Sequence, residues 1–339
     1  MKNKPKLNFK NNFIVLALIT VLVMVFSLKD DFNDILKILT QVNILWIIVA
    51  ICLVFTYWGF RAISIIIFAK KFNEDYKSKE GMKLVMATQF FNAITPFASG
   101  GQPFQVYMLR KNKLKTNEAI SVVAVNFICY QIALVLIGIT AILSNIIFHI
   151  FNKVTFLQYL VTIGFSVNVV VTIITLILVF SKKCNKGIAK FCINLLNKIK
   201  IIKNKEETIK KINDKLSEFN KSGKILINNK KDFIMGIIYN LISITCLYLV
   251  PIAVIFSIGD YTSINVFKSI ICSAYTMMIG SFVPLPGGTG GIEFGFLNFF
   301  GQYLKGPILK TLMLMWRFFT YYFGMFVGAI TFNVMERRK

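Results

Sequence analysis

The sequence predicts an all-α integral membrane protein with six full spans and two re-entrant, broken helical hairpins in an inverted-topology repeat. Three observations lead to this fold: the composition, a glycine-rich motif that occurs twice, and the distribution of basic residues. Hydrophobic residues make up 56% of the 339 positions and the mean hydropathy is +0.66. Such a composition, gathered into long apolar runs, excludes an ordinary soluble domain.

Two stretches interrupt apolar sequence with the same pattern, Pro-x-x-[Ser/Thr]-Gly-Gly-x-x-Phe. The first begins at Pro96 and the second, 190 residues later, at Pro286. Glycine and proline break helices and leave backbone polar groups that lipid cannot satisfy. Each arm beside the first break has about 10 residues, roughly 15 Å of helix, which is half of a ~30 Å hydrocarbon core. We therefore expect both stretches to be the tips of re-entrant hairpins near the middle of the membrane.

The first half of the chain contains three spans and one hairpin. Basic residues flank the hairpin on both sides, so it should enter and leave at the cytoplasmic face. Lys29-Asp30-Asp31 follows the first apolar run where a signal peptide would have a small-x-small cleavage site, which favours an uncleaved span. The expected elements are span 1 (Asn12–Leu28), span 2 (Ile44–Ala69), a hairpin over Leu84–Leu109 interrupted at Thr95–Pro103, and span 3 (Glu118–Phe148).

The second half repeats this order after span 4 (Phe156–Ser181). Its elements are span 5 (Phe233–Ile258, bent at Pro251), a hairpin over Phe267–Tyr303, and span 6 (Pro307–Val334). Spans 2 and 5, and spans 3 and 6, start 189 residues apart, close to the offset of the motifs. Because each half has an odd number of spans, the second half has the opposite orientation in the membrane to the first, as in secondary transporters. We expect a single transmembrane domain of two repeats, 12–150 and 156–335, with both termini in the cytoplasm.

The segment 182–231 between spans 4 and 5 carries 15 lysines against four acidic residues. This charge is typical of a cytoplasmic loop that attracts anionic headgroups, and we expect no nucleic-acid partner. Apolar residues recur in it every three or four positions, which predicts amphipathic helices. These helices lie either on the inner leaflet or against the cytoplasmic ends of the spans.

Five residues are arginine against 34 lysines, and two of the five, Arg61 and Arg317, lie inside predicted spans. At ~1.5 Å per residue, Arg61 is about 12–13 Å from the inner end of span 2 and Arg317 about 15 Å from the outer end of span 6. Both reach the depth expected for the hairpin tips and for Glu293, and an acidic residue at that depth is a candidate functional group. Arginine grips phosphate with a planar fork, and the freed backbone amides of the tips would add to it.

The sequence thus predicts a phosphate-binding site at mid-membrane. Its candidate residues are Arg61, Ser99, Gly100, Gly101, Pro286, Gly287, Gly288, Thr289, Gly290, Gly291, Glu293 and Arg317. The alternative is that Arg61 or Arg317 neutralises Glu293 as a buried structural pair. Trp58 and Trp316 are too deep for an interfacial belt and either line this site or pack in the core.

Nothing in the sequence indicates a cofactor, a metal site or a catalytic triad. The six cysteines show no metal-binding spacing, and the single histidine, His149, stands at an outer span end. The glycines of the second motif lack the Lys-[Ser/Thr] that follows a phosphate-binding loop of nucleotide hydrolases. We therefore expect no nucleotide-driven pumping within this chain.

The stretches Thr95–Phe104 and Pro284–Glu293, with Trp316-Arg317 and Tyr321-Tyr322, resemble the lysylphosphatidylglycerol synthase transmembrane-region family. That region is the membrane half of the multiple peptide resistance factor and also occurs alone in flippase-like proteins. The resemblance implies translocation of a phospholipid, best known as lysyl-phosphatidylglycerol, from the inner to the outer leaflet. It carries over to Gly100, Gly101, Pro286 to Gly291, Glu293 and Arg317.

Two departures from the family bear on function. Full-length members continue into a soluble aminoacyl-transfer domain, whereas this chain ends five residues after span 6. The first motif also has Pro103 where many relatives carry an acidic residue, so the headgroup specificity can differ from theirs.

We expect a phospholipid flippase or scramblase in a bacterial cytoplasmic membrane, with anionic phospholipids and a separate synthase protein as partners. The oligomeric state is left open. One alternative is a phosphatidylglycerol lysyltransferase, but the ~50-residue loop at 182–231 is too short for a domain with its own core. The other is a transporter of a small anion or a glycolipid carrier.

Overall fold

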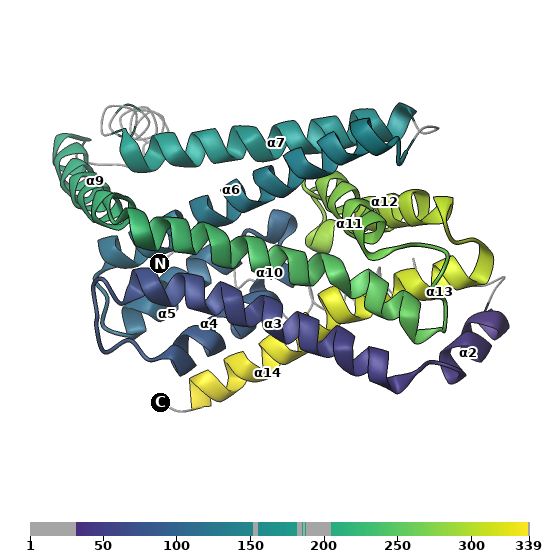
Figure 1. Ribbon diagram of the computed structural model, residues 1–339. Coiled ribbons are helices and arrows are strands. Elements are labelled where there is room, and N and C mark those ends of the chain that lie inside the picture. Colours follow the sequence, from purple (N-terminus) through teal and green to yellow (C-terminus); the bar gives the residue numbers. More distant parts are fainter. Residues whose placement is uncertain (1–31, 152–154, 182–184, 186, 188–204, 338–339) are drawn as a thin grey trace, which may run out of the picture.

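The computed structural model describes residues 32–151, 155–181, 185, 187 and 205–337 (Figure 1). Within these residues the secondary structure is helical, without strands. Five of the described helices are long and apolar enough to cross a membrane, which confirms an all-α integral membrane protein. They are α3 (Ile44–Ala69), α6 (Thr116–Phe148), α7 (Thr155–Phe180), α10 (Lys230–Ser257) and the interrupted helix formed by α13 (Gly306–Arg317), the π-turn η4 (Phe318–Tyr322) and α14 (Phe323–Arg337). Predicted span 1 lies outside the described residues.

Both glycine-rich stretches break their helices where the sequence predicts. The first hairpin consists of α4 (Ser78–Ala93), η1 (Pro96–Ala98) and α5 (Gly101–Lys111). The second consists of α11 (Val266–Gly280), η2 (Pro286–Gly288), α12 (Gly291–Phe299) and η3 (Phe300–Gln302). At equivalent positions of the two tips the backbone is left-handed, with φ of +52° at Phe97 and Ala98 and +63° and +62° at Gly287 and Gly288. The two motifs thus start with the same left-handed turn and then differ, since φ is −75° at Gly100 and +88° at Gly290.

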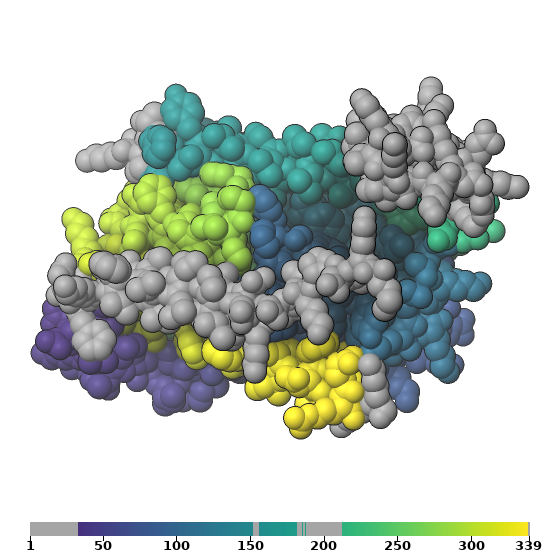
Figure 2. All heavy atoms as spheres, turned by 180° about the vertical axis from the view of Figure 1, so that it is seen from behind, coloured from purple at the N-terminus to yellow at the C-terminus, as the bar shows by residue number. Residues whose placement is uncertain are grey.

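The hairpins enter the molecule from opposite ends. Basic loops gather at one end, where Lys71 forms an ion pair with Asp232 and Lys111 forms one with Glu336. The first hairpin starts and finishes at this end, whereas the loops around Asn43, Tyr261 and Tyr303 lie at the other, where the second hairpin starts and finishes. The tips η1 and η2 contact each other between the two ends. From behind, the second hairpin, in yellow-green, lies between α7 and the C-terminal helix (Figure 2).

Contacts that helices of one half make, within that half and with the other half, recur for the equivalent helices of the other half. Helix α3 packs on α4 as α10 packs on α11, and α14 packs on α4 as α6 packs on α11. The equivalent helices α3 and α10 pack against each other and run antiparallel, since the amide of Asn43 donates to the carbonyl of Ser257 at one end and Lys71 pairs with Asp232 at the other (Figure 1). An axis in the membrane plane relates inverted repeats in this way. These contacts support the inverted repeat, whose orientation in a membrane stays a prediction.

Two further helices lie at the ends of the molecule. Helix α9 (Lys205–Asn228), the described part of the basic insert, packs against α6, α7 and α10, and its Leu226 is fully buried. For this segment the structure shows packing on the helix ends; the predicted stripe from residue 188 to 202 lies outside the described residues. Helix α2 (Phe32–Thr40) packs against α13 at the opposite end.

Candidate functional site

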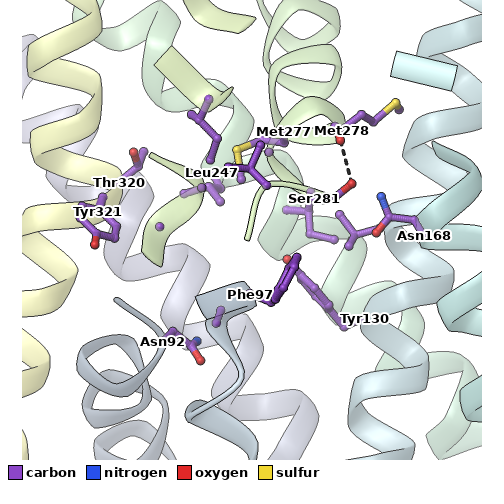
Figure 3. A pocket seen from close by; sticks show the side chains of 18 of the residues that line it. Asn92, Phe97, Tyr130, Asn168, Leu247, Met277, Met278, Ser281, Thr320 and Tyr321 are labelled. Atoms are coloured by element: carbon purple, nitrogen blue, oxygen red, sulfur yellow. Dashed lines mark hydrogen bonds between the residues drawn. The ribbon is translucent and has the colours of Figure 1, made fainter. Parts of the chain in front are cut away.

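A cavity of about 830 Å³ lies where the two hairpin tips meet. Phe97 and Ala98 of the first tip and Gly287 and Gly288 of the second line it, together with residues of α3, α6, α7, α10 and the α13–η4 junction. Figure 3 shows Asn92, Phe97, Tyr130, Asn168 and Tyr321 around it, each from a different element. Its walls are largely apolar, with amide and hydroxyl groups and two arginines among them. This is the arrangement of a small-molecule or lipid site.

Arg317, at the end of α13, binds two residues of the second hairpin tip, Glu293 and Gly287. Its Nε lies 2.7 Å from Oε1 of Glu293, and the two side chains are only 5% and 19% exposed. Its Nη2 donates to the carbonyl of Gly287 at 3.2 Å. The guanidinium also lies over the ring of Tyr321, 4.6 Å from Cζ to the ring centre. Arg317 therefore forms the structural pair that the sequence offers as one alternative, while it also lines the cavity.

Glu293 faces the interior of the second tip. One carboxylate oxygen pairs with Arg317, and the other accepts a hydrogen bond from the amide of Gly290 at 2.7 Å, which caps the first turn of α12. Both oxygens thus have protein partners. Among the described residues that line the cavity, none is acidic.

Arg61 lines the same cavity from α3 and has a different environment. Its Nη1 donates to the hydroxyl of Tyr57 at 3.2 Å, and its Cζ lies 4.4 Å from the ring centre of Tyr130. No described carboxylate is within ion-pair distance of it. Aromatic faces stabilise a guanidinium but do not cancel its charge. Arg61 is therefore a cation without a protein counter-charge in the described part of the chain.

Tyr321 connects the two tips. Its hydroxyl donates to the carbonyl of Ala93, at the end of α4, at 2.9 Å. Its ring lies against Gly287, where a Cβ would come within 2.2 Å of the ring carbon Cε2. Only glycine can thus occupy position 287, both because φ is positive and because the ring fills the space.

Most of the other predicted site residues support the tips from outside the cavity. The amide of Ser99 donates to Pro96, the amide of Gly100 donates to Oγ1 of Thr95, and Gly101 packs against Asn92 without room for a Cβ. In the second tip, Thr289 Oγ1 donates to the carbonyl of Pro286. The amides of Gly288, Thr289 and Gly290 donate within the tip. Of these predicted site residues only Gly288 lines the cavity; Ser99, Gly100, Gly101, Thr289, Gly290 and Gly291 do not. The amides of Ser99, Gly100, Gly288, Thr289 and Gly290 already donate within the tips and are not free to hold an anion.

The structure adds residues to which the sequence analysis assigned no role in the site. Tyr57, Tyr130 and Tyr321 surround the two arginines, and Asn92 and Asn168 line the cavity. Tyr57 stands four residues before Arg61 and Tyr321 four after Arg317, a spacing that puts each pair on one helix face. From this spacing, Tyr57 and Tyr321 could have been predicted as neighbours of the two arginines. Trp316 lines the cavity, whereas Trp58 is buried against Phe55 and Phe323.

Comparison with known proteins agrees with this architecture. The family described as the lysylphosphatidylglycerol synthase TM region matches residues 12–328. A UPF0104 membrane protein of Archaeoglobus fulgidus is 21% identical over 315 residues, which cover 88% of each of the two chains. The family match includes both hairpins, so the residues that line the cavity lie within the matched part of the chain.

Proposed function

The chain belongs to the lysylphosphatidylglycerol synthase transmembrane-region family, and from this premise we propose that it moves a phospholipid between the leaflets of a membrane. The family makes the protein a multi-pass membrane protein with a lipid-related role. Flippase or scramblase activity is the specific proposal. Its cargo is a lipid of the phosphatidylglycerol or lysyl-phosphatidylglycerol kind.

The observation that carries the proposal is the cavity between the hairpin tips. Because the hairpins enter from opposite ends, a site at their meeting point lies between the two ends of the molecule. Sites of transporters with inverted repeats lie in such positions, between broken helices near the midplane. A volume of about 830 Å³ is in the range of sites that bind ligands the size of a lipid headgroup.

The chemistry of the cavity fits a phospholipid in two respects. Apolar side chains of α6, α7 and α10, such as Leu134, Phe165 and Leu247, line one part of it and suit acyl chains. Arg61 and Arg317 line another part, and a guanidinium binds phosphate with charge-assisted hydrogen bonds. A phosphate that entered would supply Arg61 with its missing counter-charge.

The ends of the molecule fit a location in a bacterial cytoplasmic membrane. The clustered basic loops would lie on the cytoplasmic side, with both termini, and would contact anionic headgroups. A separate synthase would supply an aminoacylated lipid if that is the cargo.

The test is leaflet exposure in reconstituted liposomes. Acyl-labelled phosphatidylglycerol and its lysyl derivative are placed in the inner leaflet, and their appearance outside is followed with a membrane-impermeant quencher. Protein-dependent exposure of either lipid is expected. Vesicles that hold folded protein but expose neither lipid faster than protein-free vesicles would overturn the proposal. Glycerol phosphate added to the buffer tests the alternative of a soluble-anion transporter. If the protein is a flippase, micromolar glycerol phosphate should not slow the exposure of the labelled lipid.

A further inference from the structure

The charges around the cavity define the class of headgroup. We infer that the cargo is a net-anionic phospholipid whose headgroup is neutral apart from its phosphate, such as phosphoglycerol, and not one with an added ammonium group. This inference rests on the proposed function and concerns the same cavity. It follows from the separate environments of Arg61, Arg317 and Glu293.

Among the described residues, the only carboxylate at this depth is that of Glu293, and both of its oxygens have partners within the protein. Glu293 pairs with Arg317 at 2.7 Å and accepts from the amide of Gly290, and it does not line the cavity. Each of the other described acidic residues lies in a loop, in α2, in α9 or in the first or last turn of a membrane helix, and Asp30 and Asp31 lie outside the described residues. The apolar run 12–28, which lies outside the described residues, contains no acidic residue either. The described part of the interior therefore offers no free carboxylate to an ammonium group.

The charge that faces the cavity is positive. Glu293 neutralises Arg317, so the net charge of about one positive unit comes from Arg61. The guanidinium of Arg61 contacts the hydroxyl of Tyr57 and the ring of Tyr130. A buried, unpaired charge is costly in a low-dielectric interior, and a ligand anion removes that cost. A lysyl headgroup brings two ammonium groups for one phosphate and would place further positive charge beside Arg61.

Two neutral side chains of the cavity present hydrogen-bond acceptors. The side-chain amide nitrogens of Gln89 and Asn168 donate to carbonyls of their own helices, Val85 and Gly164, at 3.1 and 3.0 Å. Their carbonyl oxygens are left as acceptors, which the hydroxyls of a glycerol headgroup can use. An ammonium could also donate to them, so the exclusion of an ammonium headgroup rests on the charge of Arg61. The cavity thus combines one cation for a phosphate with neutral acceptors for hydroxyls.

The experiment compares three lipids that share one labelled acyl chain. Phosphatidylglycerol, phosphatidylethanolamine and lysyl-phosphatidylglycerol, with net charges of about −1, 0 and +1, are reconstituted singly with the wild-type protein. Exposure of phosphatidylglycerol should be at least about tenfold faster than that of the lysyl lipid, with phosphatidylethanolamine between them. Arg61→Gln should remove most of this preference, whereas Arg110→Gln, at the exposed end of α5, should keep it.

The outcomes separate this inference from the function on which it rests. If the lysyl lipid moves as fast as phosphatidylglycerol or faster, the anionic cargo is wrong and lipid movement stands. If none of the three lipids moves, the proposed function fails and the inference fails with it. A preference for phosphatidylglycerol that survives in Arg61→Gln would show that Arg61 does not select the headgroup.

Discussion

Arg317 and Glu293 form an ion pair inside the protein, with Nε of the arginine 2.7 Å from Oε1 of the glutamate. The pair joins α13 to the tip of the second hairpin, since Arg317 also binds the carbonyl of Gly287. It fixes the shape of the cavity and removes one of the two arginine charges from it. Arg61, which has no such partner among the described residues, then determines the charge that a ligand meets.

Removal of one member of this pair should destabilise the protein. Glu293→Gln or Arg317→Met leaves the other charge buried without a partner, which should lower the free energy of unfolding by about 3 kcal/mol. The double variant should recover much of this loss, because no unpaired charge remains. Unfolding in detergent measures both effects. Lys111→Met, which breaks the more exposed pair with Glu336, is the control and should cost less than about 1 kcal/mol. Equal costs at the two pairs would contradict the buried role of Glu293.

Gly287 should not tolerate alanine. The new Cβ would lie 2.2 Å from the ring of Tyr321, and that ring is held by the hydrogen bond from its hydroxyl to Ala93. Gly306 has nearly the same φ, +60° against +63°, and nothing within 4 Å of a Cβ. Gly306→Ala therefore measures the backbone strain alone, about 1 kcal/mol. We expect Gly287→Ala to cost at least about 2 kcal/mol more in the same unfolding assay; a similar cost for both would show that the ring can move.

Phe97 should be replaceable by glycine with a gain in stability. Its φ of +52° is unfavourable for a residue with a Cβ, and its side chain is 61% exposed, so little apolar burial is lost. Phe97→Gly should raise the free energy of unfolding by about 1 kcal/mol. Phe97→Ala keeps the Cβ and should not show this gain. Identical melting temperatures for the two variants would indicate that the tip is not strained at this residue.

Asp260 should make the stability of the loop between α10 and α11 depend on pH. Burial alone would raise the pKa of its carboxyl, but hydrogen bonds from Ser263 and Thr262 outweigh burial and lower it. A carboxyl group whose pKa is lower in the folded protein stabilises the fold at pH values above its ordinary pKa of about 3.9. This contribution is lost as the pH falls through the pKa that the group has in the folded protein. Because the group is largely exposed, the effect should stay below about 1 kcal/mol. Asp260→Asn should flatten the melting temperature between about pH 5 and about pH 3; an unchanged slope would contradict this role.

The helices and the hairpin breaks could be predicted from the sequence because their signals are local. Long apolar runs fix the spans, and Pro96 and Pro286 with the following glycines leave no continuous helix possible. The depth of Arg61 and Arg317 follows from the rise of a helix, and the structure places both on one cavity. Which arginine pairs with Glu293 could not be predicted, since that depends on how separate helices pack.

Two other features of the site lie beyond sequence reasoning. Ser99, Gly100 and Gly101 look like ligand contacts because glycine frees backbone amides. In the first tip, however, the amides of Ser99 and Gly100 donate internally, and Gly101 allows close packing on Asn92. The left-handed backbone at Phe97 contradicts its residue preference, and the equivalent Gly287 of the second tip has the same sign of φ.

The most direct test of the account is the rate at which Arg61→Gln exposes acyl-labelled phosphatidylglycerol in reconstituted vesicles. The substitution removes the unpaired cation and breaks no described ion pair, so the variant should fold as stably as the wild type. We predict a rate at least about tenfold below that of the wild type and of the Arg110→Gln control. A folded Arg61→Gln protein that moves phosphatidylglycerol at the wild-type rate would contradict the account.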